Sequence, residues 1–486
     1  MNTDRRCADA VRETDDGGVA EGVQPWLALV EQIARTRSLG AQLGDLQGSI
    51  SWRMTAPLRA LRSRMLSGTG ATPSRFTPVA AAAPGSSGVG VPHVPMPRAV
   101  EGLLRNMREP SGSGRLLVDV SEVDREDLGA GIQRVTKRLF IELLCNPPDG
   151  MRVVPVRLGS DGLYRHAWRF CERLFGVPQG QFGDESVVGP LDGDTLLGLD
   201  LCRRQHEAFA LALQALRASG TRVLIVVYDL LPHTHPQWFP EEVARDYQCW
   251  LRLVAQHADV ALCISNHVRT ELVAAFSSHG LGFSGRMELL PLGADGLGRP
   301  GILIRSATPR VLMVGTVEPR KGHSEALGAF EQLWKQGRRV ELVVAGRPGW
   351  KCAGLHKRIR RHRYYGSLLH WYEAPDDVEL TALLGSSDLL LMASLGEGYG
   401  LPIAEAGRAG CRLLLRDLPV FREVARDRAR YFSGAGLEQE LSSFLVAGAS
   451  WPSSQPESWP SWRDSAAAVT SIVRGVYAPI DSQGSA

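Results

Sequence analysis

Two adjacent cations, Arg320 and Lys321, stand where an apolar strand pattern gives way to a helix pattern, in VLMVGTVEPRKGH. The strand ends at Gly315, and helical spacing begins in SEALGAFEQLWKQG. Helix-end amides and cations that follow a parallel strand favour an anion. Each cation–oxyanion pair at about 4 Å contributes roughly 4 kcal/mol at an effective dielectric of about 20, before desolvation is subtracted. The pattern predicts a diphosphate site that stabilises a leaving group without a metal, the alternative being two solvated loop residues.

Two glutamates, Glu397 and Glu405, belong to the stretch LGEGYGLPIAEA at residues 395–406. A buried-strand pattern, DLLLMAS, precedes the stretch, the glycines allow close approach of the backbone, and Pro402 suits the first turn of a helix. We therefore expect Glu397 to reach into a crevice from a loop and Glu405 to lie on the inner face of the helix. The alternative for Glu405 is a partly buried carboxylate paired with an arginine such as Arg408.

A glycine-containing loop follows the first strand pattern, in DVSEVDREDLGAGIQRVTKRL. Gly129 and Gly131 precede a helix pattern that begins at Ile132, so backbone amides are expected to face a crevice here as well. The next two residues, Gln133 and Arg134, fit either this crevice or the solvated surface of the helix.

Asp229 ends another buried strand pattern, in VVYDLLPHTHPQWFP, and His233 and His235 follow it. A polar residue at the carboxyl end of a strand favours a functional role, whereas a lone histidine is as often structural. Ser265, in ALCISNHVRTELV, is expected only to cap a helix.

Short β-branched runs alternate with longer helical stretches from residue 115 onward, and a second series of the same kind starts at PRVLMVGTV. This alternation is typical of parallel strands with crossover helices, so the fold class is α/β with two doubly wound, Rossmann-like domains that face a cleft. The predicted divisions begin with a helical N-terminal extension (residues 1–66) and a flexible linker (67–114). An acceptor-side domain (115–300) and a donor-binding domain (301–455) follow. The chain then ends in a crossover helix with a tail (456–486).

The segment before the domains has a different composition. Residues 67–98 are rich in Gly, Ser, Ala and Pro and predict a linker. Before them, SISWRMTAPLRALRSRML is a basic amphipathic stretch. Two interpretations stay open for residues 19–66: peripheral binding to an anionic membrane surface, or packing on the protein itself or on a second copy.

Composition narrows the function classes. The 486 residues are 44% apolar and 22% charged, which indicates two globular domains with an appendage. A net charge of +3 gives no general reason to expect nucleic acid as a partner. The eight cysteines contain no Cys-x-x-Cys pair, which argues against a zinc site or a disulfide framework and favours a reducing, cytoplasmic location. The sequence has neither the apolar core of a signal peptide nor a run of about 18 apolar residues. We therefore expect neither export by a standard signal nor a membrane-spanning segment.

The combination of the Arg320–Lys321 pair, the element from Glu397 to Glu405, and the following CRLLLRDLPVFREVARDRARYF resembles the retaining GT-B glycosyltransferases of glycosyltransferase family 4. More narrowly, it is similar to bacterial mannosyltransferases that build O-antigen or exopolysaccharide. The resemblance covers about residues 115 to 477. It implies a nucleotide-sugar donor and a glycan or lipid-linked glycan acceptor.

The resemblance also implies roles for single residues. Arg320 and Lys321 would neutralise the donor diphosphate, beside Gly315, and Glu405 would bond to the ribose of the nucleotide. Glu397 would contact the hydroxyls of the donor sugar. The sugar pocket would be completed by the backbone of Gly398, Tyr399, Gly400 and Leu401. Near the diphosphate would lie Gly129 and Gly131. Hydroxyl groups would be oriented by Asp229 and His233.

The activity that follows is transfer of a hexose, mannose from GDP-mannose, with retention of configuration. Because two cations and helix dipoles take the place of a metal and no Asp-x-Asp element occurs in either crevice, we expect no metal and no cofactor. The alternatives are the same fold with GDP-rhamnose, GDP-fucose or a UDP-hexose, and a non-catalytic nucleotide-sugar-binding scaffold of polysaccharide assembly.

Overall fold

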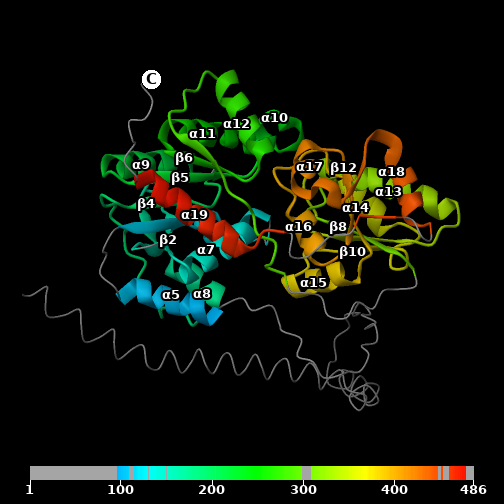
Figure 1. Cartoon of the computed structure of the whole chain (residues 1–486), viewed down its shortest axis with the longest axis horizontal. Coiled ribbons are helices and arrows are strands. Elements are labelled where there is room, and N and C mark those ends of the chain that lie inside the picture. The colour runs from blue at the N-terminus through cyan, green and yellow to red at the C-terminus, as the bar shows by residue number, and fades with distance from the viewer. Residues whose placement is uncertain are drawn as a thin grey trace, which may run out of the picture. The chain divides into compact units, whose positions relative to one another are not determined.

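The computed structural model describes residues 96–108, 114–127, 129, 131–148, 150–202, 204–297, 308–446, 450–452 and 459–477 (Figure 1). The predicted N-terminal extension, with its proposed surface at residues 19–66, lies outside these residues.

Among the described residues, seven strands form a first sheet in the order β3-β2-β1-β4-β5-β6-β7, and every pair except the antiparallel β2–β3 is parallel. Strands such as LLVD and VLIVV are continuously buried because helices cover both faces of a doubly wound sheet. The strands are β1 Arg115–Asp119, β2 Arg152–Leu158, β3 Tyr164–His166, β4 Thr195–Gly198, β5 Arg222–Val227, β6 Val260–Cys263 and β7 Arg286–Leu289. The helices are α6 Ser121–Arg125, α7 Gly131–Cys145, α8 Trp168–Phe175, α9 His206–Ala218, α10 Leu231–Thr234, α11 Glu241–His257 and α12 Asn266–Ser278, with a 3-10 turn, η1, at Pro236–Trp238.

Six described strands form a second sheet, all parallel, in the order β10-β9-β8-β11-β12-β13. Its two faces carry separate apolar cores, one built around Phe330 and Trp334 and the other around Leu384 and Phe421. The strands are β8 Arg310–Val314, β9 Glu341–Ala345, β10 Leu369–Tyr372, β11 Leu389–Met392, β12 Arg412–Arg416 and β13 Arg430–Phe432. The helices are α13 His323–Lys335, α14 Ala353–Arg360, α15 Asp377–Ser386, α16 Leu401–Arg408, α17 Pro419–Ala425 and α18 Leu437–Phe444.

Strand order reverses between β1 and β4 in the first sheet and between β8 and β11 in the second. At such a point the helices that follow the two strands leave toward opposite faces, which opens a crevice at the carboxyl ends of the strands. The two doubly wound sheets confirm the predicted fold class, and the reversals locate where functional side chains are expected.

Helix α5, Met96–Arg108, corrects the predicted linker at residues 67–114. It packs against α7 and β2, and Ala99, Val100 and Leu103 are buried. A side chain at Gly102 would meet the carbonyl of Leu144, so the two helices touch through their backbones. The apolar spacing of MPRAVEGLLRNMR, which follows the proline-rich stretch directly, is the physical reason for the helix.

Helix α19, Trp462–Tyr477, shown in red in Figure 1, packs against α7 of the first sheet although it follows the whole second sheet in sequence. The carboxylate of Asp464 accepts bonds from the backbone N–H and the hydroxyl of Ser461, which caps the helix. Buried Ser465 accepts a bond of 3.0 Å from the backbone of Gly293. A side chain at Gly293 would clash with the backbone of Trp462, so this crossing is closely fitted.

Candidate functional site

Opposite charges meet at the carboxyl ends of β8 and β11. Lys321 Nζ lies 2.5 Å from Glu397 Oε1, and Arg320 Nη1 lies 3.2 Å from Glu397 Oε2. The other end of the Arg320 guanidinium lies 2.9 Å from Glu318 Oε1. The hydroxyl of Ser394 donates to Glu397 over 2.7 Å. The two cations predicted to bind an anion and the loop glutamate therefore form one group, which we call the ionic cluster: Glu318, Arg320, Lys321, Ser394 and Glu397.

Glycines bring the two loops of this cluster together. Gly322 has a φ of 72° as the N-cap of α13, and a side chain there would lie 2.1 Å from the carbonyl oxygen of Ala393. The backbone N–H of Leu395 donates to the carbonyl of Arg320 over 2.7 Å. Gly315, with a φ of 137°, lies against the side chain of Lys321. Only glycine fits both the close approach and the left-handed backbone at residue 322.

The charge state of Glu397 follows from competing effects. Burial alone would raise the pKa of its carboxyl, but Lys321 and Arg320 outweigh burial, and bonds from Lys321 and Ser394 add to them, so the pKa falls to about 2. Glu397 is therefore ionised at neutral pH and neutralises part of the charge of both cations.

The carboxyl of Asp229, which follows β5 in the first sheet, interacts electrostatically with the charged side chains of the ionic cluster. Burial raises its pKa, and Arg320 partly opposes that rise while Glu397 adds to it. The loop of Glu397 touches the first sheet directly, because a side chain at Gly398 would meet the carbonyl of Tyr228 and the Cβ of Asp229. The structure thus brings the predicted Asp229 to the cations.

His233 lies in a different environment. Its Nδ1 is 2.7 Å from the side-chain amide of Gln248 on α11, and its ring centroid is 4.7 Å from that of His279. Burial lowers its pKa, and His279 lowers it further. The side chain is therefore turned onto α11, and its predicted role in orienting hydroxyls stays a prediction.

Several buried polar atoms of the ionic cluster and of the adjacent His323 have no hydrogen-bond partner among the described residues. They are Oε2 of Glu318, Nε of Arg320 and both ring nitrogens of His323. Burial lowers the pKa of His323 to about 3, with Lys321 acting in the same direction, so its ring is neutral. Buried polar atoms cost free energy unless they are bonded, so this group is suited to a polar ligand. The sequence interpretation missed His323; its signal was its position as the first residue of a helix directly after the cations.

Glu405 lies on α16 and forms an ion pair with Arg134 on α7, with both oxygens close to the guanidinium. Arg134 Nε is also 3.8 Å from Asp377, and Arg138 donates to the same carboxylate over 2.9 Å. Arg408, the alternative partner of Glu405, instead donates to the carbonyl of Trp459. Arg134 is thus not a solvated surface residue, and Glu405 takes its counter-charge from the other sheet's domain.

Residues 398–401 lead from Glu397 into α16, and the tyrosine side chain among them bonds to the first domain. The Tyr399 hydroxyl donates to the carbonyl of Leu292 over 3.3 Å, and burial raises the pKa of Tyr399 to about 12. Gly400 has a φ of 90° and begins α16, of which Leu401 is the buried first residue. The hydroxyl of Ser265 caps α12 and also donates to the carbonyl of Gly398 over 2.7 Å, so its expected role as a cap alone was wrong.

Gly129 and Gly131 stand at the start of α7, one turn before Arg134. Gly129 has a φ of 63°, and its N–H donates to Asp127 over 3.0 Å. Apart from neighbouring residues of the chain, no atom of the described residues lies within 4 Å of the place that a Cβ at either glycine would take. The predicted position of these two glycines near a diphosphate stays a prediction.

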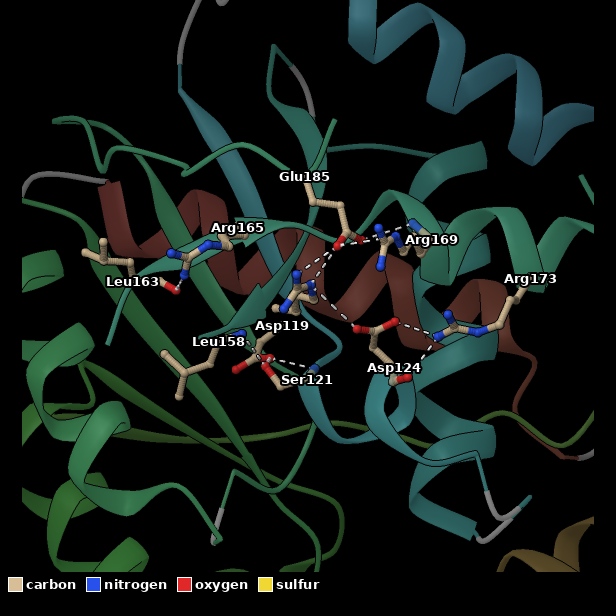
Figure 2. Close-up of polar contacts among 10 residues, drawn as sticks. Asp119, Ser121, Asp124, Leu158, Leu163, Arg165, Arg169, Arg173 and Glu185 are labelled. Atoms are coloured by element: carbon tan, nitrogen blue, oxygen red, sulfur yellow. Dashed lines mark hydrogen bonds and ion pairs between the residues drawn. The ribbon is translucent and has the colours of Figure 1, made fainter. Parts of the chain in front are cut away.

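The first sheet has a cluster of its own at its strand-order reversal, which the sequence interpretation missed. Asp119, at the end of β1, accepts bonds from Ser121 (Figure 2). It also accepts bonds from the Tyr164 hydroxyl over 2.8 Å and from the Cys202 thiol over 3.3 Å. Asp200, after β4, accepts bonds from the backbone of Val123 and Leu201. Burial raises the pKa of both carboxyls, that of Asp200 to about 7. We call these groups the neutral cluster: Asp119, Ser121, Tyr164, Asp200 and Cys202.

Figure 2 also shows an ion-pair network on the surface beside the neutral cluster. Asp124 lies 2.5 Å from Arg173 and 3.7 Å from Arg157, and Arg157 lies 2.8 Å from Glu185. More than half of the Arg173 side chain is exposed, so water and salt screen this pair.

In the described part of the chain, no three His, Cys, Asp or Glu side chains gather as metal ligands would. None of the described helices combines the length and the apolar character needed to cross a membrane.

Comparison with known proteins supports the fold and the family of the second domain. The family Glycosyl transferases group 1 matches residues 299–443. The serotype-specific mannosyltransferase WbdA of Escherichia coli is 34% identical over 377 residues, which are 72% of this chain and 45% of WbdA. O-antigen chain mannosyltransferase B of Escherichia coli is 24% identical over 217 residues, 42% of this chain and 56% of that protein. The chain therefore spans about half the length of these curated relatives.

Among solved structures, sucrose-phosphate synthase from Thermosynechococcus elongatus aligns with 75% of this chain and 99% of its own, at a TM-score of 0.50 and 12% identity. At this identity the likeness concerns the fold alone. It agrees with the two doubly wound sheets of this chain. Residues 299–443 therefore match the glycosyl transferases group 1 family, and the two doubly wound sheets of the chain have the GT-B fold.

Proposed function

We propose that this chain is a retaining glycosyltransferase that transfers mannose from GDP-mannose to a growing bacterial surface glycan, an O-antigen or exopolysaccharide. Support comes from the relatives, which are named as mannosyltransferases of serotype or O-antigen specificity. In this proposal the protein works in the cytoplasm and needs no cofactor besides its donor.

The ionic cluster is the observation that carries the proposal. Two cations share one ionised glutamate at a strand-order reversal, beside unpartnered buried polar atoms. A diphosphate brings more negative charge than one carboxylate, so it can replace Glu397 as the partner of Arg320 and Lys321. Glu397, released from the cations, would then accept bonds from hydroxyls of the donor sugar.

In the proposed reaction, the bond between the anomeric carbon and the diphosphate oxygen breaks, and an acceptor hydroxyl oxygen bonds to the same face of that carbon. The acceptor proton passes to the departing phosphate oxygen, and the nucleoside diphosphate leaves. The two cations stabilise the charge that develops on this leaving group, which is the role a metal ion plays elsewhere. We therefore propose that turnover is independent of divalent metals, and persistence of activity in EDTA tests this.

The Arg134–Glu405 pair gives the nucleotide its proposed place. Ribose hydroxyls would bond to Glu405 in exchange for Arg134, and Arg134 would then be available to the diphosphate at the start of α7. The contacts that close the two domains on each other would exclude water from the donor.

Nucleotide release is the test. Purified protein is incubated with GDP-mannose, GDP-fucose, GDP-rhamnose, UDP-glucose or UDP-galactose, with mannose-containing acceptors. We expect acceptor-dependent release of GDP from GDP-mannose, lost in Glu397→Ala and kept in the matched control Glu373→Ala, an exposed glutamate paired with Arg360. Release from another donor would replace mannose in the proposal, and donor binding without release across the acceptor panel would favour the non-catalytic scaffold.

A further inference from the structure

Three aromatic side chains form what we call the aromatic rim: His235, Trp238 and Trp350. The rings of His235 and Trp238 stack with centroids 4.1 Å apart and an angle of 9° between planes. Trp350 is 38% exposed, and the other two are partly exposed. Large aromatic surface in contact with water is unfavourable, and such a group on a soluble domain marks a binding surface more often than a scattered apolar residue does.

The rim lies beside the loop that carries Glu397. A side chain at Gly396 would meet the Trp238 ring at 3.0 Å and Leu231 at 2.9 Å. Leu395, the neighbouring residue, is 43% exposed. The rim is therefore separated from the proposed donor-sugar position by one loop residue.

Polar contacts hold the rings in place. The indole N–H of Trp350 donates to the carbonyl of Trp238 over 2.7 Å. Lys351 donates to the carbonyls of Gln237 and Phe239 over 2.9 and 2.6 Å. Because these bonds fix the backbone of η1 and the Trp350 indole, a ligand that stacks there meets rings that are already oriented.

The chemistry of the rim fits a sugar ring. A hexose presents an apolar face of C–H groups, which can cover an aromatic ring, and a polar edge of hydroxyls. His235 shares its Nδ1 with the Thr234 hydroxyl over 2.9 Å, and its other ring nitrogen has no partner among the described residues. That nitrogen can bond to a hydroxyl at the edge of a stacked sugar.

We propose that the aromatic rim is an acceptor subsite, which holds a hexose of the acceptor glycan next to the residue that receives the donor sugar. The inference rests on the proposed glycosyl transfer and specifies where its acceptor binds. It makes the three residues positioning residues. It also requires that an oligosaccharide bind more tightly than a single sugar, since only the longer ligand reaches both the rim and the reacting position.

The test uses the full chain with GDP present and measures the Kd of α-linked mannotriose by saturation-transfer NMR. We expect the Kd to rise about fivefold to tenfold in Trp350→Ala and in His235→Ala. Trp350→Phe keeps a stacking face while losing the bond to Trp238, so its Kd should stay within about twofold of wild type. Tyr365→Ala, which removes an exposed tyrosine on the same domain, is the matched control and should bind as wild type.

The Kd of GDP, measured by calorimetry on the same variants, separates the rim from folding and from the donor site. Unchanged GDP binding together with weakened mannotriose binding supports the subsite. This result would hold even if no donor released its nucleotide and the proposed transfer were wrong. Three results would overturn it: no binding of mannotriose to wild type, equal binding in Trp350→Ala, or parallel loss of GDP and mannotriose.

Discussion

The two sheets hold buried carboxylates at the same topological position by different means. In the neutral cluster of the first sheet, Asp119 and Asp200 accept bonds from hydroxyl, thiol and backbone donors, and burial raises their pKa values. In the ionic cluster of the second sheet, Lys321 and Arg320 outweigh burial and lower the pKa of Glu397 to about 2. At the same strand-order reversal, the first domain thus has carboxyls held by hydrogen bonds, and the second domain has a carboxylate held by ion pairs.

The two clusters differ in how easily their carboxyl groups can be displaced from their partners. A buried carboxyl with neutral donors stays in place whether or not it is protonated, because its bonds come from fixed backbone and packed side chains. A carboxylate held by long cationic side chains can be exchanged for another anion without loss of their charge pairing. We therefore expect substitutions in the ionic cluster to change chemistry and those in the neutral cluster to change stability.

The largest effect is expected for Lys321→Met. The side chain keeps much of its length, but the site loses one of its two cations, so charge on the leaving group is less stabilised. We expect kcat/KM for nucleotide release to fall by about 10³-fold, in the range found when one preorganised charge-stabilising donor is removed. Lys357→Met, an exposed lysine of α14, is the control and should leave the rate unchanged. Retention of the wild-type rate in Lys321→Met would show that the cluster is not the donor site.

A smaller effect, opposite in sign for the two clusters, is expected in the pH dependence of stability. The folded pKa of Asp200, about 7, exceeds its unfolded value of about 3.9, so the folded state binds more protons between them and stability falls as pH rises through this window. The folded pKa of Glu397, about 2, is below its unfolded value of about 4.3, so stability falls as pH decreases through that window.

Calorimetric Tm values of Asp200→Asn and Glu397→Gln, relative to wild type from pH 2 to 8, measure these two contributions. Asp200→Asn should remove a decline of a few kcal/mol between about pH 4 and 7. Glu397→Gln should remove a loss below about pH 4 and should be less stable than wild type at neutral pH, because two buried cations lose a partner. If both variants followed wild type in parallel, the contrast between the clusters would be incorrect.

The smallest effect is expected for Asp124→Ala, in the surface ion-pair network of Figure 2. Solvent screens its pair with Arg173, so removal should cost less than about 1 kcal/mol of unfolding free energy. Urea unfolding at low and high salt measures this cost, which should shrink further as salt rises. A larger, salt-independent cost would mean that charge pairs support the first domain as well.

Features carried by consecutive residues could be predicted from the sequence. The strand, the cations and the helix after Gly315 are local, and so is the loop of Glu397, so their positions at a crevice followed from pattern and topology. The fold class followed from alternation alone. Helix α5 was missed because its helical spacing directly follows a segment whose composition predicts a linker.

Features that join distant residues could not be predicted. The Arg134–Glu405 pair connects positions 271 residues apart, and no local pattern indicates which side of α7 meets α16. His233 illustrates the same limit, since its position after a strand end does not show that its ring turns onto Gln248. The neutral cluster was missed although Asp119 and Asp200 follow strand patterns as Asp229 does, because the partners of Asp119 lie 45 and 83 residues away in sequence.

Helix α19 has a consequence for biosynthesis. The first sheet leaves the ribosome with Leu289 of β7, yet the surface of α7 that α19 covers stays exposed until residues 462–477 have been translated. At a rate of about 5–20 residues per second, the delay is roughly ten to thirty-five seconds. During this interval the nascent first domain presents an incomplete core, and the second domain can fold before the first is finished. The order of completion is therefore the reverse of the order of synthesis.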